Sequence, residues 1–319
     1  MPLQVLLILI ALAFLWVPAL LHPAAVQPSG AVLFDLLASA LGGAPLVGVV
    51  VAIVLVAAEG LLLNIVLAGA GLVPQTSLLP TLLYVCAASA TCTTLEPSLL
   101  VNLLLIGCIQ QLTVHETALS ISTRKICNVG AMIGLCSMLS LPAVAIFFSY
   151  IFIAISYRLY NWRDWASFLL GFAAPYTVLV GVEAYRGTLA QTFSGILGSL
   201  ASFSPTVSAA ASVAFFANIA LSLVMLAALI VSVGKMQEHG VLWQKNAQMV
   251  MLFVIGAFAA LLYAGLLPVS TDLFAVVFAL CGTLMLLPSR HSMLVSPKRK
   301  RAWTRDALLL LTIVAALLC

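Results

Sequence analysis

Long apolar runs without charged residues recur along the whole chain, and this feature most limits how it can fold. Hydrophobic residues make up 64% and charged residues 7% of the 319 positions, whereas an average soluble domain carries roughly 25% charged residues. Disordered, coiled-coil and disulfide-rich secreted proteins are not built from such runs either. The sequence predicts an all-α fold, a polytopic transmembrane helical bundle that forms one integral membrane domain over residues 1–319, with no separate soluble domain.

A helix needs about 20 apolar residues to cross the roughly 30 Å of hydrocarbon in a bilayer. Stretches that approach this length lie at 3–21, 45–67, 77–92, 98–112, 126–141, 142–157, 166–184, 208–234, 248–266, 270–288 and 306–319. The first is expected to be a retained helix, because it lacks a basic leader and a small-x-small cleavage site. Leu141 and Pro142 interrupt 126–157, which is predicted to form two short helices with a tight turn; one long kinked helix is the alternative.

The basic residues orient these spans, since loops rich in Lys and Arg stay on the cytoplasmic side. With the N-terminus inside, 12 of the 13 Lys and Arg residues fall in inner loops and only Arg186 falls outside. Joining 126–157 into one span would move most of these charges outward. We therefore expect about eleven spans with an inner N-terminus and an outer C-terminus, in a multi-pass protein of the bacterial cytoplasmic (inner) membrane.

Two segments outside the spans are expected to form helices in the outer membrane interface. One covers 185–207, where large apolar residues recur at helical spacing, and the other covers 31–41. On the inner side, the basic stretch 297–303 predicts contact with anionic lipid headgroups. Because membrane spans flank this stretch, membrane lipid is the expected partner and nucleic acid is not.

Polar side chains inside a bilayer are costly and mark candidate functional sites. Glu59 and Asn64 lie in the second span, and Asn102 lies in the fourth. Five residues turn a helix by about 140°, so Glu59 and Asn64 are expected on different faces with separate partners. These three side chains could line a path for a proton or a substrate. The alternative is that Glu59 is protonated, or hydrogen-bonded across helices, and only fixes packing.

A second group of charged residues falls at the outer face: Asp35, Glu96, Glu183, Arg186 and Asp272. An outward carboxylate can act as a general base, and Arg186 can hold a lipid phosphate. Asp35 is the strongest catalytic candidate, because it follows the first span and precedes the second. Arg186, Glu96 and Asp272 are candidates for contact with substrate or lipid phosphate, and Glu183 can pair with Arg186 on one helix end. The alternative is that all five are solvated loop charges.

No pattern predicts a metal site or a cofactor. The four histidines lie in loops on two sides of the membrane and cannot meet at one ion; they are His22, His115, His239 and His291. The seven cysteines lie mostly inside apolar stretches, form no CxxC pair and are expected to be buried thiols.

Two local motifs predict helix contacts. Gly130 and Gly134 make a GxxxG match, which permits close approach of two helices. In the string Asn161-Trp162-Arg163-Asp164-Trp165, two tryptophans flank an Arg-Asp pair at the entrance of a span. This arrangement fits an aromatic belt with an acid at a helix start, and docking of a partner is the alternative.

The same string, followed by Pro175-Tyr176, is similar to the Asn-Trp-Arg-Glu-Trp…Gly…Pro-Tyr signature of a Bacteroidota family of polytopic inner-membrane proteins, defined as a domain of unknown function. Residues 58–64 and 80–84, with Asn102, resemble its N-terminal half, and the resemblance covers roughly residues 1–190. Some members carry the label beta-carotene monooxygenase. We do not expect that activity, because such an enzyme holds iron with four histidines, which cannot meet here.

The order of elements also resembles the C-type (GT-C) glycosyltransferases, which begin with a span, an outer loop with interfacial helices and closely spaced short spans. This resemblance implies sugar transfer from a polyprenyl-phosphate donor at the outer face, in envelope glycan assembly. Asp35 would be the base and Arg186 would bind the phosphate, with Glu96 or Asp272 assisting. The chain departs from the pattern, because its first outer loop is short and the acid expected beside the first span is absent.

Whether the chain is an enzyme therefore stays open, since a relic of this fold without catalysis is also possible. A non-catalytic scaffold subunit of an envelope complex needs no site at all. A transporter of a small molecule or lipid would use Glu59, Asn64 and Asn102 along its path.

Overall fold

The computed structural model describes residues 2–26, 32–41, 44–74, 77–92, 94–113, 121–140, 146–156, 161–187 and 240–265, together with a few isolated positions. The regular elements in these ranges are α-helices, and the ranges contain no strand. They are α1 (Pro2–Leu21), α2 (Val32–Leu41), α3 (Pro45–Gly69), α4 (Leu79–Thr91), α5 (Pro97–Leu112), α6 (Thr123–Leu139), α7 (Ile146–Ser156), α8 (Trp162–Arg186) and α11 (Val241–Gly265). The predicted all-α class is confirmed for this part of the chain.

Two of the described helices, α3 and α8, are 25 residues long and apolar enough to cross a membrane. α4 and α5 are also apolar but have 13 and 16 residues. The predicted spans 208–234 and 306–319 lie outside the described residues, as do most of 270–288 and most of the expected interfacial helix 185–207. The count of about eleven spans stays a prediction.

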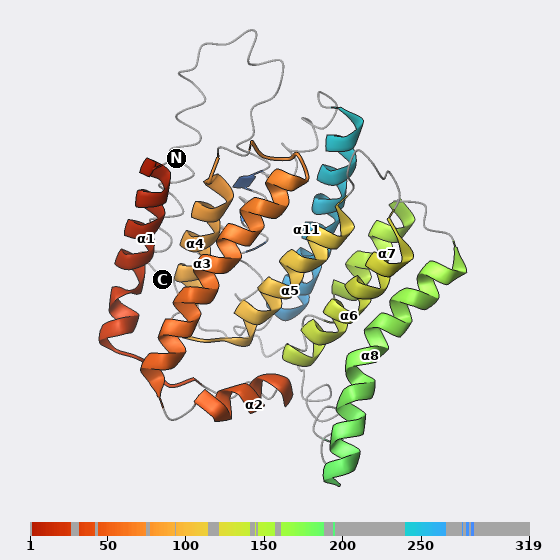
Figure 1. The fold of residues 1–319 in the computed structure, drawn as a ribbon, viewed down its shortest axis with the longest axis horizontal. Helices are drawn as coiled ribbons and strands as arrows, with labels where there is room; N and C mark the ends of the chain where they lie inside the picture. The colour runs from red at the N-terminus through yellow and green to blue at the C-terminus, as the bar shows by residue number, and fades with distance from the viewer. Residues whose placement is uncertain are drawn as a thin grey trace.

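The first helices alternate in direction (Figure 1). Trp16, near the end of α1, donates a 2.9 Å hydrogen bond to Ser89, near the end of α4, so these two helices run the same way. α3 runs the opposite way, because Gly60 in its second half accepts a 2.9 Å bond from Thr81 at the start of α4. α2 lies across one end of the bundle and packs on α3 and α6. A helix is thus present where 31–41 predicted one.

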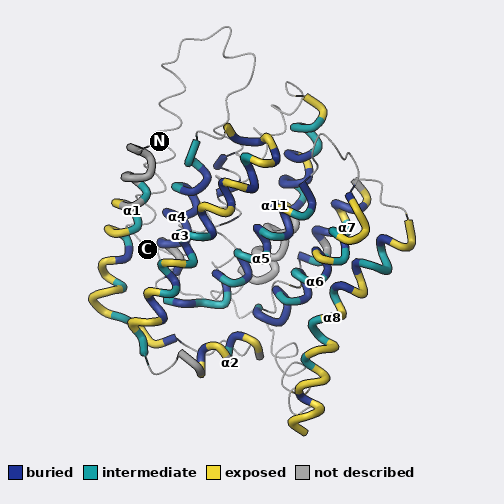
Figure 2. The backbone as a smooth tube through the Cα atoms, viewed as in Figure 1, coloured by how far each residue is buried: buried dark blue, intermediate teal, exposed yellow. Residues whose placement is uncertain are grey.

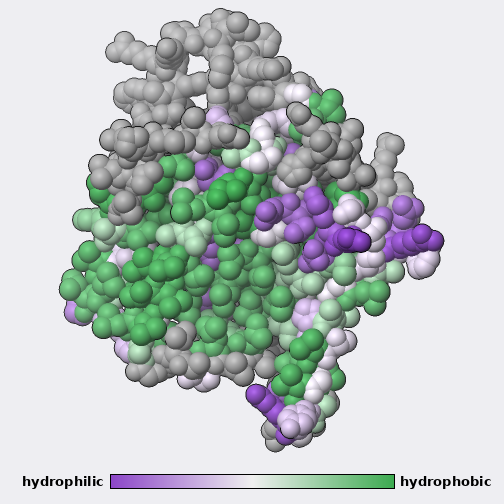
Figure 3. Space-filling view, viewed as in Figure 1, coloured by the Kyte–Doolittle hydropathy of each residue, from purple (hydrophilic) through white to green (hydrophobic). Residues whose placement is uncertain are grey.

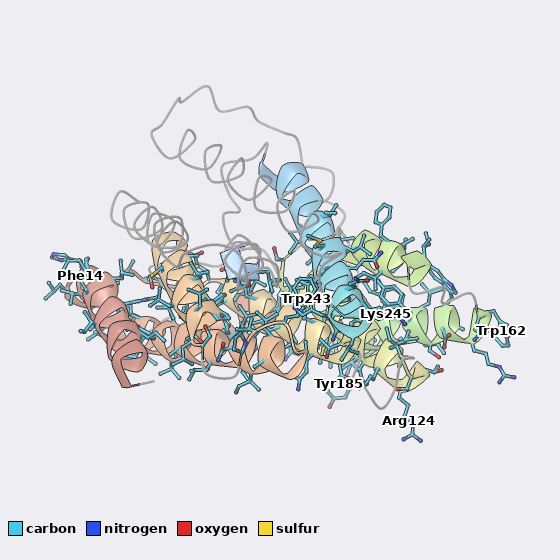
Figure 4. All side chains as sticks on the ribbon, turned by 90° about the horizontal axis from the view of Figure 1, so that it is seen from above. Phe14, Arg124, Trp162, Tyr185, Trp243 and Lys245 are labelled. Atoms are coloured by element: carbon cyan, nitrogen blue, oxygen red, sulfur yellow. The ribbon has the colours of Figure 1, made fainter. Side chains whose placement is uncertain are left out.

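α6 and α8 run in the same direction along their whole contact. Thr123 Oγ1 donates to Asp164 Oδ1 at 2.9 Å near the start of both helices, and Ser137 Oγ lies 2.6 Å from the Tyr176 hydroxyl farther along. In Figure 4, Arg124 and Trp162, from the starts of these helices, lie on the same side of the molecule. The chain must therefore reverse its direction between Leu139 and Trp162.

α7 makes this reversal. Its Tyr150 stacks on Phe168 with ring centroids 3.7 Å apart, and its Phe147 contacts Phe172 one turn farther along α8, at 5.3 Å. As residue numbers rise along α7 they fall along α8, so the two helices are antiparallel. The predicted pair of short helices in 126–157 is confirmed, and the alternative of one long kinked helix is wrong.

The GxxxG match lies where α6 packs against α8. A Cβ atom at Gly130 would collide with the Phe168 carbonyl oxygen, and one at Gly134 would lie 2.6 Å from the Phe172 carbonyl oxygen. From the other side, a Cβ atom at Gly171 would collide with the Cys127 carbonyl oxygen. Glycine on both helices lets the backbones of α6 and α8 touch, as the motif predicted.

The outside of the bundle is largely apolar. Buried residues line the contacts between helices (Figure 2), while large apolar side chains such as Phe14, Val54, Ile65, Leu170 and Val178 are exposed. Figure 3 shows a broad hydrophobic face over α1 and α3, with hydrophilic residues toward helix ends. A surface of this kind suits contact with lipid tails rather than with water.

Candidate functional site

A fully buried carboxyl group lies at the contact between α3 and α4. Glu59 of α3 has an exposed fraction of 0%, and the Tyr84 hydroxyl of α4 donates a hydrogen bond to its Oε2 atom. The next residue, Gly60, lets α4 come close, because a Cβ atom there would lie 3.2 Å from Thr81 Cγ2 and 3.4 Å from Tyr84 Cδ1. The local sequence therefore brings the tyrosine to the acid.

α5 adds a third polar side chain. Asn102 is buried, and its side chain hydrogen-bonds the same Tyr84 hydroxyl. Glu59, Tyr84 and Asn102 thus join α3, α4 and α5 at one point, and we refer to them as the Glu59 cluster. The sequence singled out Glu59 and Asn102 separately, and the structure brings them together through Tyr84.

The Glu59 carboxyl group has unused capacity. Its Oε1 atom accepts no hydrogen bond from any described residue, and no Lys, Arg or His of the described chain forms an ion pair with it. An unpaired carboxylate is costly in apolar surroundings. The Glu59 carboxyl group is therefore stable there when it is protonated or when a cation binds beside it. The Glu59 cluster can therefore take up and release a proton, with Tyr84 as a fixed hydrogen-bond donor.

Asn64 does not belong to the Glu59 cluster. It is buried on α3, its Oδ1 atom has no hydrogen-bond partner among the described residues, and no hydrogen bond in the described chain joins it to Glu59. This agrees with the prediction that Asn64 and Glu59 do not share one face of the helix.

Glu96 is half-buried at the loop between α4 and α5, where it is the N-cap residue of α5. The Cys92 thiol donates a 3.7 Å hydrogen bond to its Oε2 atom. Burial raises the pKa of the Glu96 carboxyl group above its ordinary value of 4.5, and the bond from Cys92 lowers it by less. Glu96 is thus not a fully solvated loop charge.

The other outer candidates lie on separate elements. Asp35 is in the first turn of α2 and is half-exposed. Arg186, exposed in the last turn of α8, pairs with the buried Glu183 at 4.0 Å, which confirms the predicted pair. Asp272 lies outside the described residues. Arg186 therefore has its acidic partner on its own helix.

The described residues contain no group of three or more His, Cys, Asp or Glu side chains that could hold a metal ion. The cysteines in this part of the chain are free thiols: Cys86, Cys92, Cys108, Cys127 and Cys136. Four of these five are buried, as expected for small apolar side chains.

Tyr84 is the residue that the sequence did not single out. A tyrosine in an apolar helix resembles any other large core side chain, and only the position of Glu59 on a neighbouring helix gives its hydroxyl a partner.

No protein-family model, curated protein or solved structure matches this chain.

Proposed function

We propose that this chain is a multi-pass protein of the bacterial inner membrane. The apolar length of α3 and α8 supports this, as do the exposed apolar side chains on the outside of the bundle. The alternating helix directions agree with the predicted topology, since the starts of α6 and α8, with Arg124 and Arg163, lie at one end.

Within this protein, we propose that the Glu59 cluster serves transport, by binding and releasing a proton. One observation carries this proposal: Glu59 is a fully buried carboxyl group with one donor, Tyr84, and one oxygen atom that no described residue satisfies. A side chain kept only for packing would gain from having both oxygen atoms bonded, since an unsatisfied buried polar atom costs about 1–3 kcal/mol. Ionisable groups at such positions are typical of proton relays in membrane proteins.

Proton flux into proteoliposomes tests the proposal. The wild-type protein is expected to dissipate an imposed pH gradient faster than protein-free liposomes, followed with an entrapped pH-sensitive dye. Glu59→Gln keeps the shape of the side chain but cannot exchange an acidic proton, and its flux is expected to fall to that of empty liposomes. Glu183→Gln, which removes a buried carboxyl group outside the cluster, is the control and is expected to keep the flux. Equal flux from wild type and Glu59→Gln would contradict the proposal, as would no flux from wild type.

A second candidate is action on a polyprenyl-phosphate-linked saccharide in envelope glycan assembly. The position of α2 favours it: this helix, with Asp35 in its first turn, lies across one end of the bundle, as an interfacial helix beside a lipid-linked donor would. Asp35→Asn and Arg186→Ala are then expected to reduce surface glycans in cells.

Purification in mild detergent distinguishes a glycosyltransferase from a scaffold subunit. Co-purified polyprenyl phosphate would support the lipid-linked donor, and a stable partner protein without such a lipid would support the scaffold. Unchanged glycans in both variants would exclude the glycosyltransferase.

A further inference from the structure

A row of polar side chains continues from the Glu59 cluster toward the end of the bundle. Ser98 lies four residues before Asn102 on α5, and residues at this spacing lie on one face of a helix, one turn apart. The Ser98 hydroxyl is 3.5 Å from the Cys92 thiol, and the same thiol contacts the Glu96 carboxylate at 3.7 Å. Hydrogen bonds join Glu59, Tyr84 and Asn102 at one end of the row, and Ser98, Cys92 and Glu96 at the other. Asn102 and Ser98, one turn apart on α5, lie between the two groups.

Burial changes along this row in one direction. The five inner members are almost completely inaccessible, with exposed fractions of 2% or less, whereas Glu96 at the end is half-buried. The row therefore connects an enclosed carboxyl group with one that solvent can reach. Apolar side chains such as Leu83, Leu99 and Leu105 are buried on the same two helices, α4 and α5.

We infer that Glu59 exchanges protons with solvent along this row and that Glu96 is its entrance. The inference rests on the proposed function, because it assumes that Glu59 is a proton site. The Ser98 hydroxyl and the Cys92 thiol can each donate and accept a hydrogen bond, although the thiol does so weakly. A proton taken from water by the Glu96 carboxylate is passed inward, and the Glu59 carboxylate receives one. Each hydroxyl or thiol that accepts a proton along the row gives up its own, so one O–H or S–H bond breaks for each one that forms. The net change is the movement of one proton from water to the Glu59 carboxylate.

The titratable groups that border this route are Cys92, Tyr84 and the two acids, Glu59 and Glu96. None of them is basic, so no fixed positive charge among these groups opposes the movement of a proton. The loop that carries Glu96 follows α4, at the end of the bundle that the predicted topology places outside.

Hydrogen–deuterium exchange at Glu59, followed by infrared spectroscopy, tests the inference. A protonated carboxyl group has its own C=O band, which Glu59→Gln identifies by removing it, and transfer to D2O shifts this band at a rate set by solvent access. The double variant Glu96→Gln, Ser98→Ala is expected to slow the shift at least about tenfold, equivalent to a barrier about 1.4 kcal/mol higher. Ser137→Ala is the matched control, because Ser137 is also a buried helical serine, on α6, and is expected to leave the rate unchanged.

The outcomes distinguish a failure of the proton route from a failure of the proposed transport function. An unchanged rate in the double variant, with the wild-type melting temperature retained, would overturn the route while leaving the flux result valid. A slowed rate in a protein that carries no proton flux would support the route and contradict transport. If Glu59→Gln removes no band, Glu59 holds no proton and the inference is wrong.

Discussion

The Tyr84 hydroxyl in α4 donates a hydrogen bond to Glu59 in α3, and both side chains are fully buried. This contact joins two residues that are 25 positions apart in the sequence, and Asn102 of α5 completes the Glu59 cluster. Because the surrounding residues are apolar, water does not compete for the hydrogen bonds inside the Glu59 cluster. The Glu59 cluster therefore links the packing of three helices to the protonation of one carboxyl group.

Tyr84→Phe is expected to destabilise the protein by about 1–3 kcal/mol, because it leaves a second Glu59 oxygen without a donor. Thermal unfolding in detergent measures the change. Tyr150→Phe is the control: Tyr150 is also buried, but its ring stacks on Phe168 and its hydroxyl has no hydrogen-bond partner among the described residues. Equal melting temperatures for the two variants would show that the Tyr84 bond does not stabilise the fold.

Gly171→Ala is expected to destabilise the protein by about 1–3 kcal/mol, because its methyl group would press on the Cys127 carbonyl oxygen and force α6 and α8 apart. Gly181→Ala, on the same helix, has nothing within 4 Å of the added atom. This variant is expected to be neutral or to gain up to about 1 kcal/mol from the higher helix propensity of alanine. Similar unfolding curves for both variants would argue against the close helix contact.

Thiol labelling tests the direction of α8. Trp162 and Tyr185 are 73% and 94% exposed near its two ends. In a chain whose native cysteines are replaced by alanine, Trp162→Cys is expected to react with a membrane-impermeant maleimide only from the cytoplasmic side, and Tyr185→Cys only from the outside. Labelling of both from one side would rule out α8 as a membrane span.

Glu96 is expected to make stability depend on pH. Its pKa is raised in the folded protein, so the folded state binds more protons than the unfolded state at pH values above 4.5. Its contribution is therefore present at low pH and is lost as the pH rises toward the raised pKa. Melting temperatures measured from about pH 4 to about pH 7, across the ordinary range of a carboxyl group, should fall more steeply for wild type than for Glu96→Gln. Parallel curves would contradict the burial of Glu96.

The sequence predicted the helices well where their residues are uniformly apolar, as in α3. The apolar spans predicted at 166–184 and 248–266 begin after the more polar first turns of α8 and α11, which start at Trp162 and Val241. In α11, Asn246 belongs to the helix and is buried, and its side chain donates a 2.9 Å bond to the Ala70 carbonyl oxygen. That partner lies 176 residues away, so no local pattern could reveal it.

The candidate site was predictable only in its parts. The cost of burying polar groups identified Glu59 and Asn102, but their connection depends on how three helices pack. Glu96 was expected to be an outer charge, whereas its contact with Cys92 follows from the short loop between α4 and α5. In the same way, Gly130 and Gly134 predicted a close helix contact, but only the fold shows that α8 is the partner helix.

Labelling with an apolar carbodiimide tests whether Glu59 holds a proton inside the bundle, since this reagent reacts with protonated carboxyl groups in apolar surroundings. Protein in liposomes is treated with the reagent, and the modified residue is identified by mass spectrometry. Modification of Glu59 is the expected result, and it should be faster in Tyr84→Phe because the hydrogen bond to the carboxyl group is lost. A Glu59 that stays unmodified, while carboxyl groups elsewhere in the chain react, would contradict it.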